Sequence, residues 1–133
     1  DAAVGVRFVS LDCSAQGEAR VRKAVPGYYV TVLKSGASTG IVGDTCVLSY
    51  DIYFVGHKAV PDQVVQSTLK AVWDNVEKLP PLHPQFKDWT RERAASADIT
   101  IPYHPAAVEF YKEKGAWSAK MDETQKKLLT LNP

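Results

Sequence analysis

Hydrophobic positions in the first 55 residues recur mainly at the two-residue period of β-strands. Val4 to Leu11 mixes β-branched and aromatic residues, and Tyr28 to Leu33 has the same character. Cys46 to Val55 alternates most clearly, because every second side chain from Cys46 to Phe54 is apolar. This pattern predicts a strand with one buried face. The glycine-containing stretch Lys34 to Asp44 predicts a loop between the second and third strands.

Apolar residues at helical spacing predict two helices in the first 80 residues. Ser14 to Ala24 predicts a short helix that Ser14 caps. Val60 to Leu79 predicts a longer helix with an apolar stripe along one face, and Pro80 and Pro81 end it.

The last third of the chain contains the clearest helix boundaries. In Ile101 to Trp117, Pro105 predicts the first residue of a helix and Gly115 predicts its end. Lys120 to Leu131 predicts a charged amphipathic helix with few apolar contacts. Leu82 to Trp89 predicts an irregular link whose large apolar side chains are buried. The order of elements indicates an α/β fold with too few strands for a complete doubly wound sheet.

Composition excludes several classes of partner. The 133 residues include 16 basic and 15 acidic ones, without the basic cluster that nucleic-acid binding requires. The longest apolar runs are far below the about 20 residues of a membrane-spanning helix. The chain begins at Asp1 without a signal peptide, which favours a mature N-terminus or a fragment boundary.

Residues with catalytic or metal-binding chemistry are sparse, so no catalytic residue, metal site or cofactor is expected. Cys13 and Cys46 lack the spacing of a metal site, and they form either a disulfide or two small core residues. His57, His83 and His104 are scattered, and no nucleophile elbow or phosphate loop occurs. His104 is expected to bond the backbone at a helix start. A Cys13 nucleophile paired with one histidine remains an alternative.

The segment from His104 to Trp117 carries a family resemblance. It reads His-Pro-Ala-Ala, then Phe-Tyr-Lys-Glu-Lys-Gly, and ends in tryptophan. It resembles the C-terminal signature of the TAXI family of TRAP transporter solute-binding proteins, in which Ala106 is usually glycine. The likeness begins near Gly5. In the family's Pro-Ala-Gly-Thr-Tyr-Pro-Gly turn, this chain matches only Gly36 and Gly40, so a ligand contact through the family's tyrosine is not expected here.

The resemblance implies a type II periplasmic-binding-protein-like fold, with two α/β lobes around the ligand. This chain is then its C-terminal part: residues 1–44 belong to the second lobe, 45–55 form a hinge or crossing strand, and 56–133 pack helices on the first lobe. The implied function is periplasmic binding of a small organic anion, such as a dicarboxylate or an acidic amino acid, for TRAP membrane subunits. An exposed apolar edge is expected where the missing N-terminal half belongs, and hence self-association. The alternative is a small α/β enzyme or a free-standing interaction domain.

For an anionic ligand, the useful groups are a cation, hydroxyls and the amides of glycine-rich turns. The candidate ligand-binding residues are therefore Lys34, Ser35, Ser38 and Thr39 in the loop, together with Tyr50 on the following strand. The alternative interpretation is a solvated loop and a packing tyrosine.

Overall fold

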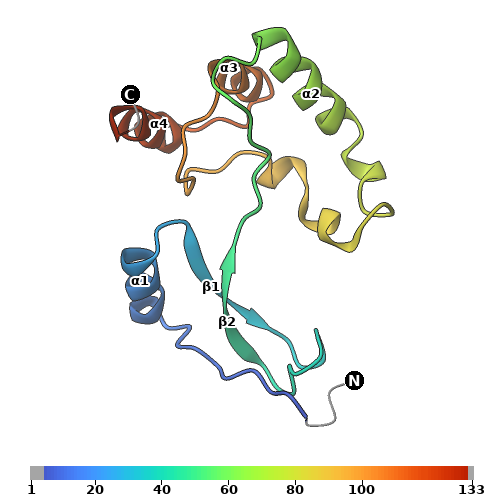
Figure 1. The fold of residues 1–133 in the computed structure, drawn as a ribbon, viewed down its shortest axis with the longest axis vertical. Helices are drawn as coiled ribbons and strands as arrows, with labels where there is room; N and C mark the ends of the chain where they lie inside the picture. Colours follow the sequence, from blue (N-terminus) through green and yellow to red (C-terminus); the bar gives the residue numbers. More distant parts are fainter. Residues whose placement is uncertain (1–4, 132–133) are drawn as a thin grey trace. The chain divides into compact units, whose positions relative to one another are not determined.

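The computed structural model describes residues 5–131, and the chain divides into two compact units, one ending at Phe54 and the other beginning at Val55 (Figure 1). The first unit contains helix α1 (Ala15–Ala24) and strands β1 (Tyr28–Leu33) and β2 (Thr45–Tyr50). The second contains α2 (Asp62–Asp74), α3 (Pro105–Glu113), α4 (Ala119–Leu131) and short 3₁₀ helices at Val76–Lys78, Pro84–Asp88 and Arg91–Arg93. The mixed α/β class is therefore confirmed.

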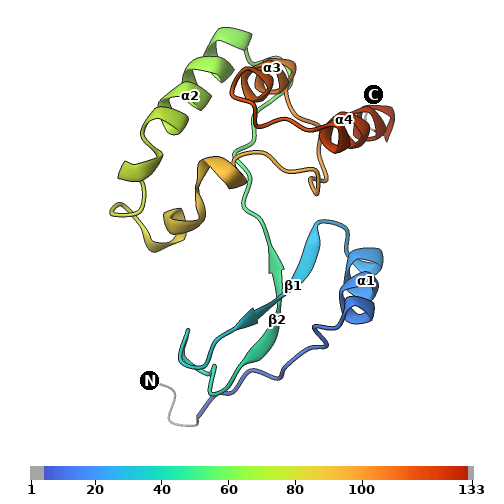
Figure 2. The same cartoon turned by 180° about the vertical axis from the view of Figure 1, so that it is seen from behind.

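In the first unit, β1 and β2 form an antiparallel hairpin in which Tyr28 pairs with Tyr50 and Leu33 with Thr45. Helix α1 lies alongside β1, as both views show (Figures 1 and 2). The helix begins where predicted, because the Ser14 side chain accepts a hydrogen bond from the backbone N–H of Gly17.

The predicted strand from Val4 to Leu11 is wrong over the residues that the structure describes; Val4 itself lies outside them. Among the described residues of this arm, the backbone–backbone hydrogen bonds to the hairpin are isolated ones, from Phe8 N–H to the Gly40 carbonyl and from Leu11 N–H to the Cys46 carbonyl. Two such bonds do not make the regular ladder of a strand.

The predicted strand from Cys46 to Val55 is too long at its far end. The strand β2 ends at Tyr50, because its partner β1 begins at Tyr28, which pairs with Tyr50. Residues after Tyr50 therefore have no register partner in β1. The local alternation of side chains continues past this point, but a strand needs a neighbour to receive its hydrogen bonds.

The predicted burial of one face of this strand is also wrong for most of its side chains. Cys46 is 4% exposed, but Leu48 is 46%, Tyr50 61% and Phe54 74% exposed. The arm before α1 contacts this face at Cys46, and the side chains beyond Cys46 stay largely exposed. Alternating apolar residues show that a face is suited to burial, and they do not show what covers it.

The second unit has its core where α2 and α3 pack together. Phe110 and Tyr111 of α3 are buried, and the ring of Trp73 on α2 meets Phe110 edge-on at 5.9 Å between centroids. The helix α3 begins at Pro105 as predicted, and Gly115, with φ of 68°, ends it as predicted. Leu82 is 72% exposed, which contradicts its predicted burial.

Polar contacts attach α4 to the rest of its unit. The Gln125 side chain accepts from the Tyr103 N–H at 2.8 Å and donates to the Tyr103 carbonyl at 2.9 Å, as a neighbouring strand would do. Trp117 donates its ring N–H to Asp122, and Leu128 is the residue of α4 that the structure buries. The expectation of few apolar contacts is consistent with this arrangement.

The cap of α3 makes a testable prediction about the second unit. His104 Nδ1 accepts the Ala106 N–H at 3.3 Å, and the His104 side chain is 17% exposed. We expect His104→Ala to lower the unfolding free energy by about 1 kcal/mol, whereas His104→Asn keeps an acceptor and loses less. Urea unfolding followed by tryptophan fluorescence measures both. Equal losses in the two variants would show that the cap bond contributes nothing.

Candidate functional site

The loop between β1 and β2 is built from two successive tight turns. Ala37 N–H donates to the Lys34 carbonyl at 3.0 Å, and Ile41 N–H donates to the Ser38 carbonyl at 3.0 Å. Gly36 and Gly40 take φ values of 79° and 88°, which side chains disfavour. Ile41 is only 3% exposed, so its buried side chain fixes the position of the loop within the first unit.

An ion pair closes the base of this loop. Asp44 accepts from Lys34 Nζ at 2.7 Å and from the Ser35 N–H at 3.3 Å. The hydrogen bond from Lys34, and then that from the Ser35 amide, hold the pKa of the Asp44 carboxyl below its usual range. The Lys34 side chain is 80% exposed and that of Asp44 is 54% exposed. The loop thus already holds one carboxylate with an ammonium and a backbone amide, the groups that bind an anionic ligand.

The structure places the predicted binding residues in two separate places. Lys34 and Ser35 lie at the base of the loop, and Ser38 and Thr39 lie in its second turn. Tyr50 lies at the other end of β2, about 17 Å from Thr45 at the usual rise per residue. There its ring packs against that of Tyr28, with centroids 5.4 Å apart. The loop residues therefore form one candidate site without Tyr50.

Asp44 was not among the predicted binding residues, although the hairpin register provides a signal for it. Leu33 pairs with Thr45, so the next residue outward on each strand, Lys34 and Asp44, face each other across the base of the loop. A basic and an acidic residue at these two positions favour an ion pair. The signal requires the register, which the sequence alone did not determine.

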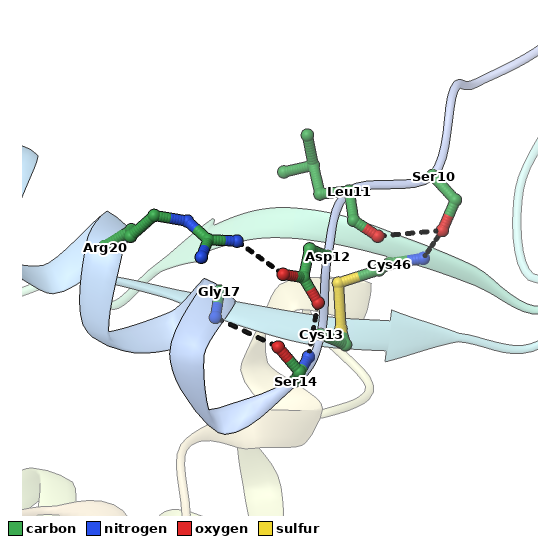
Figure 3. The surroundings of a disulfide bond; sticks show 8 residues. All are labelled: Ser10, Leu11, Asp12, Cys13, Ser14, Gly17, Arg20 and Cys46. Atoms are coloured by element: carbon green, nitrogen blue, oxygen red, sulfur yellow. Dashed lines mark hydrogen bonds and ion pairs between the residues drawn. A yellow bond between two sulfur atoms is a disulfide. The ribbon is translucent and has the colours of Figure 1, made fainter.

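Cys13 and Cys46 form a disulfide with their Cα atoms 5.7 Å apart, which decides between the two alternatives left open by the sequence (Figure 3). A bonded Cys13 has no thiolate, the form in which cysteine acts as a nucleophile. The arm before Cys13 is held to β2 near the disulfide, because Ser10 Oγ accepts the Cys46 N–H at 3.0 Å.

The three histidines share one local role in backbone turns. His57, His83 and His104 each use Nδ1 to accept the backbone N–H of the residue two positions later. For His104 this confirms the predicted bond at a helix start. Within residues 5–131, no cluster of His, Cys, Asp or Glu is arranged to hold a metal ion. In the same described range, no helix has both the length and the apolar character to cross a membrane.

Comparison with known proteins adds a family match to this geometry. Residues 1–115 match the model of the NMT1-like family, and this range includes the loop from Lys34 to Asp44 and all of α3. No curated protein matches the chain.

Proposed function

This chain belongs to the NMT1-like family, which is related to periplasmic solute-binding proteins, and on that premise we propose a more specific role. The chain is part of the solute-binding component of a TRAP-type transporter of the TAXI kind. It is not an enzyme, and it delivers a small organic anion, such as a dicarboxylate or an acidic amino acid, to the transporter's membrane subunits. The observation that carries this proposal is the family match over residues 1–115.

The proposed fold is the two-lobed arrangement of type II periplasmic binding proteins, with residues 1–44 in one lobe and 45–55 in the hinge. Two observations support it: the chain forms two compact units, and the boundary between them lies after Phe54. We further propose that the rest of the binding protein covers the apolar face that includes Leu48 and Phe54, both of which are exposed here. Without that cover, the same face favours self-association.

The anion-binding element that we propose is the base of the β1–β2 loop. Lys34 and the Ser35 amide hold the Asp44 carboxylate in this structure, so a ligand carboxylate must compete with Asp44 for the same donors. Ser38 and Thr39 supply hydroxyls in the neighbouring turn. The competition predicts that removing the charge of Asp44 frees Lys34 for the ligand and strengthens binding.

Titration calorimetry tests this proposal on the protein expressed from its whole coding sequence, with succinate, glutamate and a neutral amino acid as ligands. We expect Lys34→Ala to weaken anion binding about tenfold or more, because a charge-assisted hydrogen bond is lost. Lys23→Ala removes the same charge from an exposed position on α1 and is the matched control. Asp44→Asn is expected to strengthen binding.

Equal affinities for the Lys34→Ala and Lys23→Ala variants would show that the loop is not the anion site. If neither succinate nor glutamate binds, the proposed class of solute is wrong. Recovery of the solute after titration separates binding from catalysis, because a binding protein returns its solute unchanged whereas an enzyme converts it.

A further inference from the structure

The disulfide of the first unit joins two residues of very different accessibility. Cys13 is exposed and immediately precedes Ser14, the N-cap of α1. Cys46 is 4% exposed and lies on β2. Figure 3 shows the sulfur bridge crossing from the arm that leads into α1 to the strand. We therefore expect a thiolate from solvent to attack the sulfur of the exposed Cys13 rather than that of the buried Cys46.

Few other interactions hold the arm and α1 to the hairpin. The arm bonds to β2 through the Leu11 N–H and Cys46 carbonyl at 2.9 Å and through Ser10 Oγ, which accepts the Cys46 N–H, and it bonds to the loop through the Phe8 N–H and Gly40 carbonyl. Among the described residues up to Phe54, the buried apolar side chains are those of Ile41 and Cys46. A core this small, over a hairpin of two strands, gives little stability without a covalent link.

We propose that the Cys13–Cys46 disulfide is a redox-controlled latch that a dithiol reductant opens at Cys13. One thiolate of the reductant attacks Sγ of Cys13 and forms a mixed disulfide with it, and Cys46 leaves as a thiolate that takes up a proton. The second thiol of the reductant then loses its proton and attacks the reductant sulfur that is bonded to Cys13. Cys13 leaves as a thiolate and takes up a proton. Two electrons pass to the protein, and the reductant becomes a disulfide.

Opening the latch unfolds the first unit and leaves the second unit folded. The second unit contains no cysteine, because Cys13 and Cys46 are the two cysteines of the sequence. Its core, in which the rings of Trp73 and Phe110 pack together, consists of residues of the second unit and does not depend on the disulfide. The first unit is thus restricted to oxidising surroundings, by a device that does not depend on which solute the protein binds.

Hydrogen exchange of the full chain, with and without excess dithiothreitol, tests the latch. We expect amide exchange in α1, β1 and β2 to rise about tenfold or more on reduction, and exchange in α2 and α3 to stay within about twofold. All three tryptophans, Trp73, Trp89 and Trp117, lie in the second unit, so their fluorescence should not change. The Cys13→Ser/Cys46→Ser double variant should have the exchange rates of the reduced chain, and dithiothreitol should not change them. Retained protection in the reduced first unit, or equal loss in both units, would overturn the proposal.

The site of attack has its own test with glutathione, a monothiol that leaves the mixed disulfide in place. After acid quenching, peptide mapping should find glutathione on Cys13 about tenfold more often than on Cys46, because access decides which sulfur is attacked. A predominance of Cys46 adducts would refute attack at Cys13.

Discussion

Replacing Phe110 with alanine is expected to destabilise the second unit by about 3–5 kcal/mol. Phe110 is 6% exposed, and its ring lies edge-on to both Trp73 and Tyr111, at centroid distances of 5.9 and 5.6 Å. Alanine removes these ring contacts and leaves a cavity that the surrounding aromatic side chains only partly fill. The loss is a large fraction of the about 5–15 kcal/mol by which an ordinary domain is stable, so the variant should unfold at a much lower urea concentration.

Urea unfolding followed by tryptophan fluorescence measures this effect, since all the tryptophans lie in the second unit. Phe110→Leu keeps an apolar side chain of similar volume and is expected to cost about 1 kcal/mol, which keeps the variant measurable. Leu82→Ala is the control for an apolar truncation at the surface, because Leu82 is 72% exposed. If Phe110→Ala costs no more than Leu82→Ala, the core does not lie between α2 and α3.

The helices were predictable from the sequence where a few neighbouring residues determine their ends. Pro105 and Gly115 act through their own backbone angles, and Ser14 acts on an amide three residues away. These effects are local, so they operate in the same way whatever surrounds the helix. The same reasoning predicted the loop from Lys34 to Asp44, in which Gly36 and Gly40 take positive φ values.

Features that depend on distant partners were not predictable from the sequence. The segment ending at Leu11 has strand-like residues, but a strand requires a neighbour in register, and the arm makes only isolated bonds. Tyr50 was predicted to bind the ligand together with the loop, but the hairpin register places Tyr50 at the end of β2 that is farther from the loop. Pairing of Cys13 with Cys46 also depends on how the arm folds back, so the sequence left it open.

Replacing Gly17 with alanine is expected to destabilise the first unit by about 2 kcal/mol, against the usual sign for a helix. In an ordinary helix interior, alanine is more favourable than glycine by up to about 1 kcal/mol. At Gly17, however, a Cβ atom would lie 2.1 Å from the Asp12 carbonyl oxygen and 2.7 Å from the Asp12 Cγ. Asp12 has little freedom to move away, because the next residue, Cys13, is bonded to β2.

Hydrogen exchange of the oxidised chain measures this prediction, and about 2 kcal/mol corresponds to roughly 30-fold faster exchange in α1. Gly43→Ala is the matched control: a Cβ at Gly43 meets nothing within 4 Å, and its φ is not positive. That variant should exchange like the unmodified chain or more slowly, since alanine restricts the unfolded state. If Gly17→Ala protects α1 as well as the control does, the arm is free to shift, and the disulfide does not hold Asp12 against the helix.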